Sequence, residues 1–213
     1  METAIFEPGG YRYVRGPFQY SGGVAAQPGF AIERVRFAKP IPVEEGFRAI
    51  EAHLTAIGRP ITSFCACELR SPAPFTDQGF IDFNRVYVGT LERWGIFKDD
   101  ENPVARSNVC PEINPPAEPS FEAFSYTTPE SGQASGGFVI AGSAEAQEGG
   151  GSYAERIIRY DDTSPDAIQE KAVFVLNVME QRMAALGVDW SMANAVQTYT
   201  IHDIHPFLAD EIV

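Results

Sequence analysis

The sequence predicts an α+β sandwich in which two helices cover one face of a mixed sheet, followed by a truncated second copy of the same pattern. Two observations predict this class. Short aromatic and β-branched segments alternate with two segments of helical periodicity over residues 11–127. Four of these segments then recur in the same order after a Gly/Ser/Gln-rich stretch at 127–137. We therefore expect a complete domain at 1–130, and a linker with a partial ββαβ repeat at 131–213.

The first elements are expected to be strands. Each candidate segment is short, rich in Tyr, Phe, Val and Ile, and bounded by Gly or Pro, which is the composition of strands separated by turns. Three such segments lie before the first helical pattern: 11–16, 18–26 and 30–38.

Two helices follow from apolar residues at helical spacing. The first, 42–58, has acidic residues in its first turn and a glycine at its end. The second spans 75–97, and the segment between them, 63–71, has the composition of a strand. Residues 102–127 are then expected to form a closing hairpin, with a proline-rich turn near Ala117.

The second unit resembles the first but stops before the second helix and the closing hairpin. Its expected elements are strands at 137–147, 155–160 and 194–204 and a helix at 165–187. Chance recurrence of a strand-helix-strand pattern is the alternative explanation. The second unit has no counterpart of Arg106 or Glu122, so we expect it to pack against the first as a structural extension that covers an exposed strand edge or apolar face.

Composition and charge exclude several classes of function. The 213 residues carry a formal net charge of −13, which disfavours binding to nucleic acid and to anionic membranes. Three cysteines do not form a disulfide framework, and no signal peptide or membrane span is apparent, so we expect a cytoplasmic protein.

Arg106 and Glu122 are charges of opposite sign in the predicted hairpin. A turn centred near Ala117 would offset them by about six residues, on the order of 20 Å at the rise of a strand. They are therefore not expected to form an ion pair within one chain. If both serve a single pocket, that pocket must be built between two chains or two copies.

Segments 83–95, 102–113 and 120–124 resemble the closing signature of the Rid (YjgF-type) family of enamine and imine deaminases. They read FNRVYVGTLERWG, NPVARSNVCPEI and SFEAF, and the early segments RYVRG and YSGG are also similar to that family. The resemblance implies a chorismate-mutase-like (RidA-like) sandwich that closes as a homotrimer. It also implies a reaction that needs neither a metal nor an organic cofactor.

The resemblance also implies roles for single residues. Arg106 would bind the substrate carboxylate with its guanidinium fork, which Lys cannot reproduce. Gly22 would offer a backbone N–H to the same carboxylate, and Glu122 would hold and activate the attacking water. Tyr13 would form a wall of the pocket and transfer a proton, and Asn84 would support the arginine.

Two departures from the family pattern bear on the pocket. Asn108 stands where the family often has Cys, which makes the pocket more polar. An inserted loop at 96–101 lengthens the connection before Arg106, which would reshape the pocket mouth.

The expected function is that of a hydrolase: a deaminase that converts a 2-imino acid or 2-amino-enoate into ammonia and a 2-oxo acid. Within the family, 2-aminomuconate-type ring-cleavage products are one substrate class. Such a dicarboxylate would need a second cation, which Arg15 or Arg70 could supply. The alternative is a module of the same fold that binds small carboxylates without turnover. The presence of both Arg106 and Glu122 favours the enzyme, because binding alone needs only the arginine.

Metal binding is the weaker hypothesis for the remaining ligand-type residues. Cys65 and Cys67 alternate on one predicted strand without a nearby His. His202, Asp203 and His205 could approach a metal, but the usual ligand spacings are absent. We therefore expect no metal site.

Overall fold

The computed structural model describes residues 1–130, 136–147 and 152–212, and within them the strands form two four-stranded sheets. Sheet A contains, in spatial order, β1 (Thr3–Phe6), β2 (Tyr11–Val14), β3 (Gly23–Ala26) and β8 (Phe138–Ile140). Sheet B contains β4 (Phe30–Pro42), β7 (Ser120–Pro129), β5 (Phe64–Arg70) and β6 (Ala105–Val109). The α+β class predicted from the sequence is confirmed.

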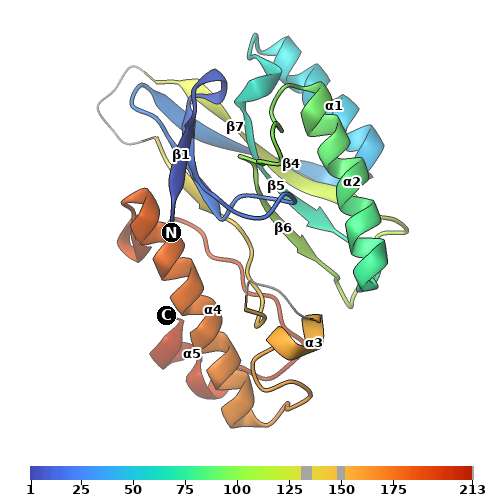
Figure 1. Ribbon diagram of the computed structural model, residues 1–213, viewed down its shortest axis with the longest axis vertical. Coiled ribbons are helices and arrows are strands. Elements are labelled where there is room, and N and C mark those ends of the chain that lie inside the picture. The colour runs from blue at the N-terminus through green and yellow to red at the C-terminus, as the bar shows by residue number, and fades with distance from the viewer. Residues whose placement is uncertain (131–135, 148–151, 213) are drawn as a thin grey trace.

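Sheet B is mixed, because β5 runs parallel to β6 and antiparallel to β7. Two helices, α1 (Val43–Ala56) and α2 (Asp77–Arg93), lie on the same side of it (Figure 1). The mixed sheet with two helices on one face is thus present, but it shares the molecule with a second sheet that the sequence did not predict.

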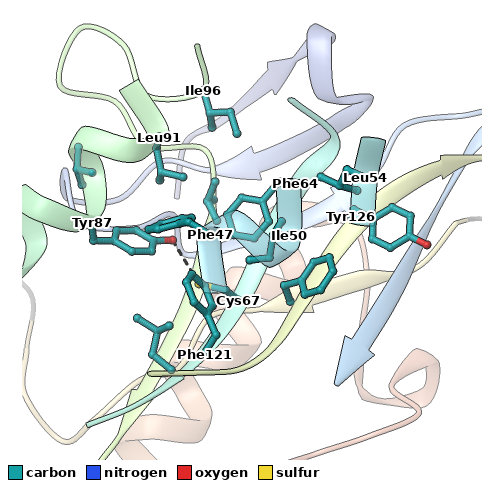
Figure 2. Close-up of a cluster of buried hydrophobic side chains, with 14 residues drawn as sticks. Phe47, Ile50, Leu54, Phe64, Cys67, Tyr87, Leu91, Ile96, Phe121 and Tyr126 are labelled. Atoms are coloured by element: carbon teal, nitrogen blue, oxygen red, sulfur yellow. Dashed lines mark hydrogen bonds between the residues drawn. The ribbon is translucent and has the colours of Figure 1, made fainter. Parts of the chain in front are cut away.

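The main core lies between these helices and sheet B, and Figure 2 shows its aromatic side chains. The helical spacing of α1 directs Phe47, Ile50 and Leu54 into it. Phe47 meets the ring of Phe121 from β7 edge to face, with 4.9 Å between ring centres. These contacts fix α1 on the sheet.

The predicted hairpin at 102–127 is wrong. Its two strands do not pair with each other, because β5 lies between β6 and β7. The chain passes from β5 through α2 to a parallel β6, a crossover that local sequence patterns do not reveal. The connection at 110–119 contains four prolines and is long enough to pass over β5 to β7.

Only some of the elements expected for a second copy form, and the copy itself remains a prediction. The strand expected at 137–147 is reduced to β8, and the expected helix is confirmed as α4 (Pro165–Leu186). The strands expected at 155–160 and 194–204 are wrong. The first is replaced by the short helix α3 (Tyr153–Arg156), which starts at a capping box between Ser152 and Glu155. The second is an irregular segment that leads into α5 (His205–Glu211).

The irregular segment contacts sheet B through side chains and not through a strand ladder. Gln197 donates to Glu68, and Arg70 donates to the hydroxyl of Tyr199 at 2.9 Å. The main chain of 194–204 is in no strand. The predicted linker at 131–135 lies outside the described residues, and the division into two domains remains a prediction.

The C-terminal segment extends and covers sheet A. β8 pairs antiparallel with β3, and Leu186 of α4 packs on Val14 and Ala25. In Figure 1, α3, α4 and α5 gather at the end of the molecule away from α1 and α2. None of the helices among the described residues combines the length and apolar character needed to cross a membrane.

A matched pair of glycine substitutions tests the packing of α1. A Cβ at Gly46 would lie 2.4 Å from a ring carbon of Phe121, whereas a Cβ at Gly89 of α2 would meet nothing closer than 4.0 Å. We expect Gly46→Ala to lower the free energy of unfolding by about 1–3 kcal/mol through overpacking. Gly89→Ala should raise it by up to about 1 kcal/mol through helix propensity. Urea unfolding measures both, and stabilisation by Gly46→Ala would contradict this packing.

Candidate active site

Arg106 of β6 is a buried charged residue. Its side chain is 4% exposed, and its guanidinium carbon lies 4.8 Å from the ring centre of Tyr87, 5.5 Å from Tyr20 and 5.8 Å from Phe83. Its Nη1 has no hydrogen-bond partner, and it makes no ion pair with any described residue. A buried donor without a partner is costly unless a ligand satisfies it, so the site is suited to an anion.

The aromatic surroundings of Arg106 are held in place by the core. Tyr87 and Phe83 come from α2, while Tyr20 comes from the loop before β3. The hydroxyl of Tyr87 and the thiol of Cys67 on β5 form a hydrogen bond of 3.3 Å, drawn as a dashed line in Figure 2. Cation–π contact explains how the charge is tolerated without a counter-ion.

Asn84 provides a second buried polar atom without a partner. Its Nδ2 donates to the carbonyl of Phe80 at 2.6 Å, but its Oδ1 accepts no hydrogen bond from the described residues. It belongs to the same stretch of α2 as Phe83 and Tyr87, the two helix residues over the guanidinium. This stretch of α2 therefore brings the unpartnered acceptor Asn84 Oδ1 to the region of the unpartnered donor Arg106 Nη1.

Asn108 shares a strand face with Arg106, because the two residues are two positions apart on β6. Their Cα atoms are therefore about 6.5 Å apart along the strand. The hydroxyl of Ser71 donates to Asn108 Oδ1 at 3.0 Å. The Nδ2 of Asn108 makes no hydrogen bond with the described residues, so it remains available as a donor.

Glu122 lies on the opposite face of sheet B from Arg106. Its neighbour Phe121 is in the core beneath the helices, while the Glu122 carboxylate accepts a bond of 2.8 Å from Arg36 Nε on β4. The expectation that Arg106 and Glu122 form no ion pair within one chain is confirmed. The predicted reason, an offset along a hairpin, is wrong: the sheet itself separates them.

Tyr13 is bonded to a residue that sequence reasoning missed. Its hydroxyl donates to Glu101 Oε1 at 2.5 Å, and Arg15 donates to the same oxygen. Burial and the bond to Glu101 raise the pKa of Tyr13 well above its usual value, so the hydroxyl stays protonated at neutral pH. Glu101 lies in the inserted loop 96–101, whose presence was the only signal in the sequence.

Gly22 is engaged within the chain. Its N–H donates to the carbonyl of Val14 at 3.0 Å, so the structure does not offer this donor to a ligand. A Cβ at this position would lie 3.1 Å from Val14 Cγ1 and 3.3 Å from Arg182 Nε. The glycine is therefore explained by close packing.

The two candidate second cations also have partners. Arg15 pairs with Glu2 as well as with Glu101. Arg70 lies 3.9 Å from the carboxylate of Glu68 and bonds Tyr199. Both are committed to contacts within the chain.

The residues considered for metal binding are dispersed. Burial raises the pKa of Cys67 to about 12, and Cys65 packs in a different cluster. Asp203 pairs with His205 at 2.8 Å on the surface, and His202 lines a separate hollow of about 200 Å³. Among the described residues, no three His, Cys, Asp or Glu side chains are grouped as metal ligands.

Comparisons with known proteins find similarity to deaminases. The family described as 2-aminomuconate deaminase CnbZ matches residues 3–213. A 2-amino-5-chloromuconate deaminase from Comamonas testosteroni is 54% identical over 212 residues, which are 99% of this chain and 84% of the relative. No solved structure matches the chain. The match includes the C-terminal segment as well as the first 130 residues.

Thermal shift tests whether Arg106 binds carboxylates. At about ten times its Kd, muconate should stabilise the protein by about 1.4 kcal/mol, a rise in Tm of roughly 3–6 °C. The rise should vanish in Arg106→Met and nearly vanish in Arg106→Lys, which lacks the guanidinium fork. Arg48→Met, on the exposed face of α1, is the control and should keep the full shift. An undiminished shift in Arg106→Met would remove Arg106 from the site.

Proposed function

The chain belongs to the 2-aminomuconate deaminase CnbZ family, and we propose that it hydrolyses the C–N bond of a 2-aminomuconate-type dicarboxylate, releasing ammonia and a 2-oxo acid. The single observation that carries the proposal is the buried guanidinium of Arg106 with its unpartnered Nη1. Membership of a deaminase family favours this reaction over a module that only binds carboxylates.

The reaction needs three proton transfers and one water. Protonation of the enamine at carbon gives an iminium ion, and water then adds to the carbon of the C=N bond and loses a proton. The resulting carbinolamine transfers a proton to its nitrogen and loses ammonia, which leaves the 2-oxo acid. A carboxylate that holds the water and a group that supplies protons are sufficient for these steps.

Arg106 would bind the carboxylate next to the reacting carbon. A bidentate bond to the guanidinium fixes the plane of that carboxylate and draws negative charge toward the ring-lined pocket. Asn84 Oδ1 would accept an N–H of the substrate amine, since it is buried and has no other partner. Together the two groups would orient the C–N bond.

Asn108 would bind the second carboxylate. It lies about 6.5 Å from Arg106 along β6, a distance comparable to the separation of the carboxylates in an extended hexadienedioate. Ser71 holds its Oδ1, which leaves its Nδ2 to donate. This assignment replaces Arg15 and Arg70, which are paired within the chain.

The carboxylate that activates water has two candidates. Glu122 lies on the far face of sheet B, so it could serve Arg106 only from another chain. This supports a homo-oligomer, expected to be a trimer, whose pockets lie between chains. Glu101, which accepts from Tyr13, is the candidate within one chain. Tyr13 stays protonated at neutral pH and would be the proton donor in either case.

Mixed oligomers separate the two candidates. Arg106→Ala and Glu122→Gln should each reduce ammonia release from freshly generated 2-aminomuconate by about 10²-fold or more. Co-expressed with different tags and purified as mixed oligomers, the two variants should recover part of the activity, because some pockets then combine both wild-type residues. Verified mixed oligomers without recovery, or a fully active monomer in light scattering, would contradict a pocket between chains and favour Glu101.

Substrate selectivity tests Asn108. Asn108→Ala should raise the KM for the dicarboxylate by about tenfold, because a hydrogen bond to a charged group is lost. A matched 2-amino-enoate without the distal carboxylate should be affected by less than about twofold. Equal losses on the two substrates would show that Asn108 does not contact the distal carboxylate.

A further inference from the structure

We propose that Arg182, in the C-terminal helix α4, is a positioning residue that holds the main chain of Arg106 in place for substrate binding. The proposal rests on the function proposed above for Arg106. It assigns a role in the site to a segment that contributes no predicted site residue of its own.

Arg182 is a buried charge directed at the main chain. It is 2% exposed, and its Nη1 donates to the carbonyl of Ala141 at 3.1 Å and to that of Gly142 at 3.3 Å. Hydrogen bonds from a charged donor are stronger than those between neutral groups, especially when buried. The position of residues 141–142 is therefore tied to α4.

Residues 141–142 in turn hold the strand that carries Arg106. The N–H of Gly142 donates to the carbonyl of Arg106 at 3.2 Å, and the N–H of Ala141 donates to the carbonyl of Gly22 at 3.1 Å. The approach is close, since a Cβ at Gly142 would lie 3.1 Å from the Cβ of Ser107. One hydrogen bond thus separates the carbonyl of Arg106 from a residue that Arg182 binds.

These contacts matter because β6 is the last strand of sheet B. On the side away from β5, the described residues that bond its main chain near Arg106 are Gly142 and Ser21, whose N–H donates to Val104 at 2.9 Å. The residue before Ser21 is Tyr20, one of the rings over the guanidinium. Arg182 also packs beside Gly22 on this same loop. It therefore contacts both segments that fix Arg106 from the edge of the sheet.

Calorimetric binding of muconate to the full chain tests the proposal. Arg182→Met removes both bonds to the carbonyls of residues 141 and 142, and should raise the Kd for muconate by about tenfold or more. The control is Arg12→Met, because Arg12 of β2 bonds the carbonyl of Leu186 at the end of the same helix without reaching 141–142. Arg12→Met should lower Tm while it leaves Kd within about twofold. Equal changes of Kd in the two variants would overturn the positioning role.

A double variant distinguishes positioning from general destabilisation. If Arg182 acts through Arg106, Arg182→Met should add no further loss of affinity in an Arg106→Lys background, which keeps weak binding. If Arg182→Met does not fold, Arg182→Lys replaces it in the test. The lysine keeps the charge but reaches fewer acceptors, so the Kd for muconate should rise by about threefold. A wild-type Kd in Arg182→Lys would also overturn the proposal. A wild-type Kd in Arg106→Met would instead show that the proposed function of Arg106 is wrong.

Discussion

The burial of a guanidinium that has no counter-ion among the described residues is the constraint on which the rest of this site depends. Desolvation of Arg106 is partly offset by three aromatic rings, and two of these come from a helix that must stay packed on sheet B. The packing of α2 and the Tyr87–Cys67 hydrogen bond therefore hold the rings against the Arg106 guanidinium as well as stabilise the core. The Nη1 of Arg106 has no hydrogen-bond acceptor among the described residues, and a substrate carboxylate would supply one.

The C-terminal segment acts as a support for the first 130 residues. It adds β8 to sheet A, covers the outer face of that sheet with α4, and ends in side-chain bonds to the open face of sheet B. The family match spans residues 3–213 and therefore includes this segment. Of the elements expected there from the sequence, the strand β8 and the helix α4 are present.

The two faces of sheet B have different roles. The face under α1 and α2 is apolar and receives Arg106 at its edge, while the other face packs partly on sheet A and also carries ion pairs such as Arg34–Glu68 and Arg36–Glu122. The sheet therefore separates Glu122 from Arg106 within one chain. Glu122 and Arg106 can therefore meet only where chains meet.

The sequence by itself determined the elements whose signal is local. Apolar spacing located α1, α2 and α4, and a short family-like motif named Arg106 and Asn108 as candidate site residues, which the structure places on β6. Only the tertiary structure decided that β5 separates β6 from β7, that Glu101 bonds Tyr13, and that Arg182 reaches the strand of Arg106. Strand pairing and side-chain contacts join residues far apart in the chain. Helical periodicity is instead a pattern of residues three and four positions apart, so the local sequence reveals it.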